Sequence, residues 1–129
     1  MVAQASTSSS SLVSAHSLAE WRGVLERAAA RNQTIIALFT ASWCAACKKV
    51  VPDFVALSAD FPHVRFVTVV VDQNEETGLE NGVRKLPTFK AFRNKADAGF
   101  VVEGADMEAV RRLVTQEGGD AVAAAAAGA

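Results

Sequence analysis

The sequence lacks the features that mark several specialised classes of protein. It contains no run of 18 or more apolar residues, so no membrane-spanning helix is expected. It has no basic block, and 13 Lys and Arg balance 14 Asp and Glu, which excludes the electrostatic footprint of a nucleic-acid-binding protein. Two cysteines among 129 residues cannot form a disulfide framework, and a chain of this length buries a core without one. We therefore expect a small single-domain protein of a reducing, cytoplasmic compartment.

The two ends of the sequence are compositionally simple. Residues 1–11 are rich in Ser and Ala and lack the basic start and apolar middle of a secretory signal. Residues 118–129 are Gly-Gly-Asp followed by an alanine-rich run. We interpret residues 1–11 as a flexible leader, residues 12–117 as the folded domain and residues 118–129 as a disordered tail.

Between these ends, helical and strand patterns alternate along the chain. Ser17-Leu18-Ala19-Glu20 matches a capping box, which predicts the start of a helix. The expected helices cover residues 18–31, 44–59, 75–81 and a last segment from Met107 onward. The expected strands cover residues 34–40, 64–71, 86–92 and 99–102, with residues 12–15 as an edge strand and a turn over residues 94–98. This alternation indicates an α/β fold, a mixed sheet with helices on both faces.

The two cysteines carry the chemistry that the sequence predicts. Cys44 and Cys47 follow a buried strand directly and occupy the first turn of a helix, so their sulfurs can come within disulfide reach. The helix N-terminus places partial positive charge against the first sulfur and favours its thiolate, the nucleophile of disulfide exchange. In that mechanism Cys44 attacks a substrate disulfide and Cys47 resolves the mixed disulfide.

Two other interpretations of the cysteines are open at this point. A zinc site requires about four ligands, and only His16 and His63 could complete one. These histidines do not form a spaced pair, so we expect no metal. Alternatively the thiols are idle, because cysteine is often buried as a small hydrophobic residue.

The segment from Leu38 to Lys48, LFTASWCAACK, resembles the active-site segment of the thioredoxin family. Pro52 inside the following helix, Val71-Asp72-Gln73-Asn74 and Gly82–Thr88 fall in register with the same family. The resemblance covers residues 12–116. It implies the thioredoxin fold, with a mixed four- or five-stranded central sheet flanked by four helices, and a helix kinked at Pro52.

The resemblance also implies a substrate site around the cysteines. Leu86–Pro87 would be a cis peptide that faces the cysteines and leaves backbone polar groups for a substrate strand; the alternative is an ordinary proline at the start of a strand. The shallow groove around Cys44 would be formed by Trp43, Ala45, Ala46, Leu86, Pro87, Gly104 and Ala105. Partners would be protein thiols and disulfides, and no cofactor is needed beyond the reversible Cys44–Cys47 disulfide.

The sequence departs from the family pattern at two places. Thioredoxins usually carry Gly-Pro between the cysteines, whereas Ala45-Ala46 restores a backbone N–H. We expect this to stabilise the dithiol form, so that the couple is less reducing than the roughly −270 mV of thioredoxin by about 30–60 mV. Leu38 and Thr68 replace a buried aspartate and its neighbouring lysine. Without a carboxylate to accept the proton of Cys47, mixed disulfides should resolve slowly.

Two functions are compatible with these features. Within the family, the length, the Ala-Ala motif and the alanine-rich tail are similar to the thioredoxin-like light chains of axonemal outer-arm dynein. That similarity implies a redox-active subunit bound to a dynein heavy chain in a flagellum or cilium. The alternative is a free cytosolic thioredoxin, which acts as a general protein-disulfide reductase.

Overall fold

The structure of the chain is a computed structural model that describes residues 12–118. The interpretations of residues 1–11 and 119–129 as leader and tail lie outside these residues. Five strands and four helices follow one another in the described part, and Gly118 is the last residue of the last helix. Their bounds are β1 Leu12–Ser14, α1 Leu18–Ala30, β2 Ile35–Thr40, α2 Ala45–Asp60, β3 Arg65–Val70, α3 Glu75–Glu80, β4 Thr88–Arg93, β5 Ala96–Glu103 and α4 Met107–Gly118.

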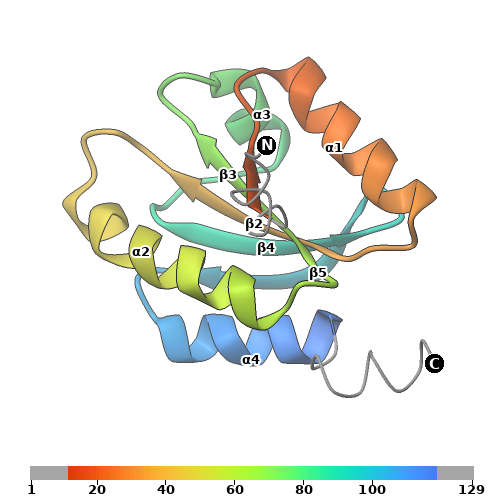
Figure 1. The fold of residues 1–129 in the computed structure, drawn as a ribbon. Helices are drawn as coiled ribbons and strands as arrows, with labels where there is room; N and C mark the ends of the chain where they lie inside the picture. Colours follow the sequence, from red (N-terminus) through yellow and green to blue (C-terminus); the bar gives the residue numbers. More distant parts are fainter. Residues whose placement is uncertain (1–11, 119–129) are drawn as a thin grey trace, which may run out of the picture.

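The strands form one mixed sheet in the order β1-β3-β2-β4-β5. β1 and β2 run parallel to β3, while β4 is antiparallel to β2 and to β5. Helices α1 and α3 cover one face of the sheet and α2 and α4 cover the other (Figure 1). The mixed α/β architecture, the five-stranded sheet and the edge strand β1 are therefore as the sequence predicts.

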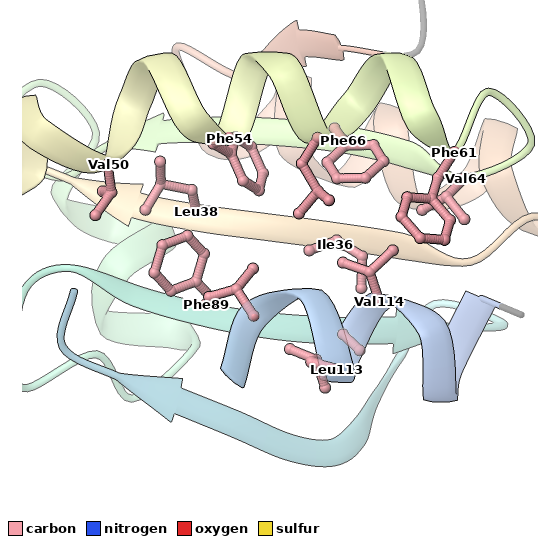
Figure 2. Close-up of a cluster of buried hydrophobic side chains, with 13 residues drawn as sticks. Ile36, Leu38, Val50, Phe54, Phe61, Val64, Phe66, Phe89, Leu113 and Val114 are labelled. Atoms are coloured by element: carbon pink, nitrogen blue, oxygen red, sulfur yellow. The ribbon is translucent and has the colours of Figure 1, made fainter. Parts of the chain in front are cut away.

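Each face of the sheet has its own apolar core. On the α2 and α4 face, Phe54 packs against Phe66 and Phe89 with ring centroids 5.2 and 5.8 Å apart (Figure 2). On the α1 face, Trp21 packs against Phe39 and Phe92 at 5.9 and 5.0 Å. Aromatic pairs of this kind contribute about 0.5–1.5 kcal/mol each beyond their buried area. Because β2 is buried along its whole length between these cores, the loop that follows it starts from a fixed point.

Three element boundaries and one local feature refine the sequence predictions. β5 begins at Ala96, not Gly99, because Asn94 and Lys95 alone make the turn, both with positive φ (53° and 71°). β4 begins at Thr88, after a Leu86–Pro87 peptide that is cis, as expected. α2 runs one residue beyond the predicted end and continues through Pro52.

Among residues 12–118, no helix has both the length and the apolar character needed to cross a bilayer.

Candidate active site

The two cysteines lie where the buried strand β2 gives way to helix α2. Cys44 is the N-cap of α2, and its backbone N–H donates to the carbonyl of Ala41 at 3.2 Å. Cys44 is 8% exposed and Cys47 is 1% exposed. Both pack with Ala41, and with the half-buried Val71 and Leu86. The first cysteine therefore sits at the surface limit of the core, and the second lies behind it.

The Cys44 sulfur acts as the cap of the helix. The backbone N–H of Cys47 donates a hydrogen bond to Cys44 Sγ at 3.2 Å. The first N–H groups of a helix lack intrahelical acceptors, and the helix dipole adds partial positive charge at this end. This geometry stabilises negative charge on the outer sulfur, which is the requirement for a nucleophilic thiol.

The inner cysteine has the opposite environment. Burial raises the pKa of Cys47, and a side-chain hydrogen bond with Cys44 raises it further. Hydrogen bonds from the Thr40 side chain and the Ala41 backbone partly oppose this rise in pKa. Cys47 therefore stays a neutral thiol at neutral pH and must lose its proton to act as the resolving group.

The loop between β2 and α2 is fixed from the end of β3. Asp72 accepts a hydrogen bond from the Ser42 backbone N–H at 3.0 Å and a short one from the Ser42 hydroxyl. These two bonds lower the pKa of Asp72 below its ordinary value, and the bond from the Ser42 side chain has the larger effect. Since Ser42 lies two residues before Cys44, this pair ties the nucleophile loop to a second strand.

We expect replacement of Asp72 by Asn to remove an acid-sensitive part of the stability. A carboxyl whose folded-state pKa is lowered stabilises the fold fully above its unfolded value, about 3.9, and loses that contribution as the pH falls through the lowered folded value. From about pH 5 to about pH 3, the urea midpoint of the wild type should therefore fall more steeply than that of Asp72→Asn.

The matched control for this comparison is Asp53→Asn. Asp53 is an exposed carboxyl on α2, away from the Ser42 loop. Its replacement should leave the pH dependence of the urea midpoint as in the wild type. Equal slopes for wild type and Asp72→Asn would show that the Ser42–Asp72 pair does not support the loop.

A surface cavity of about 470 Å³ opens beside the cysteines, between the Trp43 loop and α3. Trp43 and Leu79 stand at 70% and 79% exposure there. The cavity is lined by Trp43, Val71, Asp72, Glu75, Gly78, Leu79, Val83, Arg84 and Leu86. Its lining thus combines apolar side chains with charged side chains of both signs, and it lies next to Trp43, the residue before Cys44.

The predicted groove residues are distributed around this cavity. Trp43 and Leu86 line it, while Ala45, Ala46 and Ala105 are exposed residues that do not. Pro87 is buried, and its carbonyl accepts from the N–H of the half-buried Gly104 at 2.8 Å. The α3 side of the cavity was not predicted, since nothing in the sequence near residues 75–84 indicates that these residues lie beside Trp43.

The two residues that stand in place of the family's buried aspartate and lysine are neighbours in the structure. Leu38 and Thr68 pair across β2 and β3, and Leu38 is fully buried. The Thr68 hydroxyl is hydrogen-bonded to that of Ser14 at 2.8 Å.

Thr40, Ser42 and Asp72 were not predicted as site residues. Within residues 12–118, no group of three or more His, Cys, Asp and Glu side chains is arranged to hold a metal ion.

Comparison with known proteins agrees with this geometry. The family model described as Thioredoxin matches residues 13–116. A thioredoxin H-type of Picea mariana is 35% identical over 99 residues, 77% of this chain and 78% of that protein. A thioredoxin of Geodia cydonium is 33% identical over 85 residues, 66% of this chain and 80% of its own. The crystal structure of Schistosoma mansoni thioredoxin superposes with a TM-score of 0.77 at 30% identity, covering 84% of this chain and 96% of that one. The chain therefore belongs to the thioredoxin family.

Proposed function

We propose that the chain is a thioredoxin that reduces disulfides of other proteins through Cys44 and Cys47. The observation that carries this proposal is the placement of Cys44 at the N-cap of α2, with the N–H of Cys47 on its sulfur. A sulfur that accepts this hydrogen bond at a helix start has the surroundings of a nucleophilic thiol, and a second thiol lies within hydrogen-bond reach behind it. Thioredoxins perform this chemistry with two thiols and no bound cofactor.

The reaction balances over two exchanges. The Cys44 thiolate attacks one sulfur of the substrate disulfide, that S–S bond breaks, and the other substrate sulfur leaves as a thiolate that takes up a proton. Cys47 then loses its proton and attacks Cys44 Sγ, so that the mixed disulfide breaks and the second substrate thiol is released. The substrate gains two electrons, and the chain is left with a Cys44–Cys47 disulfide that an external thiol reductant must reduce again.

The substrate reaches Cys44 along the surface that Trp43 and Leu86 border. Cys44 is only 8% exposed, so an attacked disulfide must come down onto the sulfur between these side chains. An extended substrate segment can pair with the backbone of Leu86, since among the bonds of residues 12–118 neither its N–H nor its C=O has a backbone partner. Apolar substrate side chains then cover the exposed Trp43 ring.

The relatives reported above favour a free carrier over a subunit of a larger assembly. They bear the name thioredoxin, and they cover 66%, 77% and 84% of the chain. A role as a light chain of flagellar outer-arm dynein rests on the Ala-Ala motif, the length and the alanine-rich end alone. A cytoplasmic location fits the free carrier, because a dithiol that must be reduced again needs a reducing compartment.

Reduction of insulin disulfides tests the proposal. With dithiothreitol as the reductant, the wild type should shorten the lag before the insulin B chain precipitates. Cys44→Ser should behave as dithiothreitol alone, because no nucleophile remains. Without dithiothreitol, Cys47→Ser keeps the nucleophile and should form a stable mixed disulfide with one insulin sulfur, visible as a mass increase that dithiothreitol then removes.

The same assay separates the alternatives. Rapid turnover with a thioredoxin reductase supports the free carrier. Slow turnover by a protein that co-purifies in a large complex supports the subunit. If the wild type is no faster than dithiothreitol alone and Cys47→Ser traps nothing, the thiols are idle and the proposal is wrong.

A further inference from the structure

Thr40 is a buried polar residue at the end of the central strand β2. It is 7% exposed and is the last residue of that strand. Side chains of a strand alternate between the two faces of the sheet. Leu38 belongs to the core beneath α2 (Figure 2), and Phe39 belongs to the core beneath α1. Thr40 therefore points to the same face as Leu38, toward the start of α2.

The group that the Thr40 hydroxyl meets on this face is the inner thiol. Cys47 is 1% exposed on the buried side of α2, and the Thr40 hydroxyl and the Ala41 backbone N–H both hydrogen-bond to its sulfur. Burial raises the pKa of Cys47, whereas these two bonds lower it, which is the effect of donors that face a thiolate. Two donors from the end of β2 thus converge on a sulfur that solvent barely reaches.

No carboxylate or basic side chain assists this sulfur in the part of the chain that the structure describes. Among residues 12–118, Cys44 is the one titratable group that acts on Cys47, and it raises the pKa of Cys47. The apolar residues packed around the two cysteines are Ala41, Val71 and Leu86, which carry no charge. The donors at the end of β2 are therefore the polar groups left to stabilise negative charge on Cys47.

The mixed disulfide changes the balance of these contacts. In the free dithiol, a hydrogen bond with Cys44 and the charge of Cys44 both raise the pKa of Cys47. Once Cys44 is bonded to a substrate sulfur, it carries no charge and is no longer a thiolate that can accept that bond. Burial then opposes ionisation of Cys47, and the bonds from Thr40 and Ala41 favour it. The two donors therefore act without opposition from Cys44 at the step in which Cys47 must react.

We propose that Thr40 stabilises the Cys47 thiolate during resolution, by donating its hydroxyl hydrogen bond to the sulfur that attacks the mixed disulfide. This inference rests on the proposed dithiol function and assigns a further residue to it. Cys47 loses its proton to the solvent, and its thiolate attacks Cys44 Sγ. The bond between Cys44 and the substrate sulfur breaks, and the leaving substrate thiolate takes up a proton. The step consumes no external oxidant or reductant, and the Thr40 hydroxyl keeps its own proton throughout.

A pair of substitutions in the full chain tests the proposal. Thr40→Val replaces the hydroxyl with a methyl group and keeps the shape of the side chain, whereas Thr40→Ser keeps the hydroxyl and removes the methyl group. The substrate is the disulfide of thionitrobenzoate, so that release of the first thionitrobenzoate reports attack by Cys44 and release of the second reports resolution by Cys47. Loss of a hydrogen bond to a charged sulfur corresponds to an about tenfold smaller thiolate fraction below the pKa of Cys47.

The pH profiles of the second release should cross. A thiolate with a higher pKa is scarcer at neutral pH but is a stronger nucleophile, with a Brønsted coefficient of about 0.4–0.5. At neutral pH, Thr40→Val should therefore resolve about threefold more slowly than the wild type, and above the pKa of Cys47 it should resolve about threefold faster. Thr40→Ser should follow the wild-type profile. Because a loss of packing alone would slow resolution at every pH, the crossing is specific to the hydrogen bond.

Thr68→Val is the matched control, because the Thr68 hydroxyl lies in the same sheet and is hydrogen-bonded to Ser14 and not to a cysteine. It should leave both releases unchanged. A normal first release together with parallel second-release profiles for wild type and Thr40→Val would overturn the inference and leave the dithiol function intact. So would a Thr40→Ser profile that follows Thr40→Val. A wild type that releases no thionitrobenzoate would overturn both.

Ionisation of Cys47 without any exchange reaction is the second measurement. The Cys44→Ser variant keeps a helix cap but has no second thiol, so the ultraviolet absorbance of the thiolate follows Cys47 alone. Addition of Thr40→Val should lower the thiolate fraction about tenfold at each pH below the pKa of Cys47, and addition of Thr68→Val should not change it. Equal thiolate fractions with and without Thr40→Val would overturn the proposal, even if that variant had altered stability.

Discussion

Replacement of Leu38 by Asp is expected to lower the free energy of unfolding by about 3–5 kcal/mol and to speed the resolution of mixed disulfides by about tenfold. The loss of stability follows from the position of Leu38. Its side chain is fully buried and lies between Val50 of α2 and Phe89 of β4 (Figure 2). Shortening a buried leucine leaves a cavity, and a carboxyl group without partners adds the cost of removing it from water.

The gain in rate follows from the same position. Cys47 and Val50 are one turn apart on the buried face of α2, and Val50 packs in the cluster that contains Leu38. A carboxyl at residue 38, beside Val50, would therefore lie about one helical turn along α2 from the Cys47 thiol. Burial raises the pKa of Cys47, so deprotonation limits its attack on the mixed disulfide. A buried carboxylate, whose own pKa is raised, can accept that proton directly or through a water molecule.

The resolution step is measured with the disulfide of thionitrobenzoate as the substrate. Attack by Cys44 releases the first thionitrobenzoate, and attack by Cys47 on the mixed disulfide releases the second, whose rate of appearance is the resolution rate. Leu38→Asn is the matched control, because it has the size and polarity of Asp but cannot accept the proton. Both variants should lose similar stability in urea unfolding, and only Leu38→Asp should resolve faster. The wild-type rate should rise with pH through the range in which Cys47 ionises, and the Leu38→Asp rate should depend less on pH. Equal resolution rates for the two variants would contradict a proton-transfer role for this position.

Local sequence patterns were sufficient to predict most of the fold. The capping box at Ser17, the apolar run that forms β2 and the position of Cys44 at a helix start depend on residues close together in the chain, and their elements lie within about one residue of the prediction. The start of β5 was predicted three residues late. Asp97 and Gly99 resemble turn residues, but Asp97 pairs with Lys90 across the strands at 2.8 Å, a contact that only the register of β4 and β5 creates.

The candidate site shows the same division between local and long-range information. The two thiols and their helix were predictable from five consecutive residues. The hydrogen bonds from Ser42 to Asp72, across 30 residues, and the side of the cavity formed by α3 depend on which strands become neighbours. A small cavity lined by Arg27, Arg31 and Arg65 likewise joins the second half of α1 to the start of β3. Such contacts require the sheet order, which neither composition nor periodicity contains.

Replacement of Ala46 by Pro is expected to make the dithiol couple more reducing by about 30 mV, a tenfold change in the equilibrium with glutathione. Ala46 is the second residue of α2, and its N–H is one of the first-turn donors that have no acceptor within the helix. Proline removes that donor without disturbing later helix bonds, since the first turn tolerates it. The reduced form loses stabilisation of the outer sulfur, so the disulfide becomes relatively more stable. Redox titration of the wild type should give about −240 to −210 mV.

Ala45→Gly is the matched control, since it alters the same pair of residues and leaves both N–H groups in place. Its potential should stay within about 10 mV of the wild type, well under the shift equivalent to a tenfold change. If Ala45→Gly moved the potential as far as Ala46→Pro, chain flexibility rather than the N–H donor would set the couple. A wild-type potential of about −270 mV or lower would show that the alanine pair does not weaken the reductant at all. The Ala46 N–H would then have no effect on the redox potential. The Cys47 N–H would be the donor that stabilises the Cys44 sulfur.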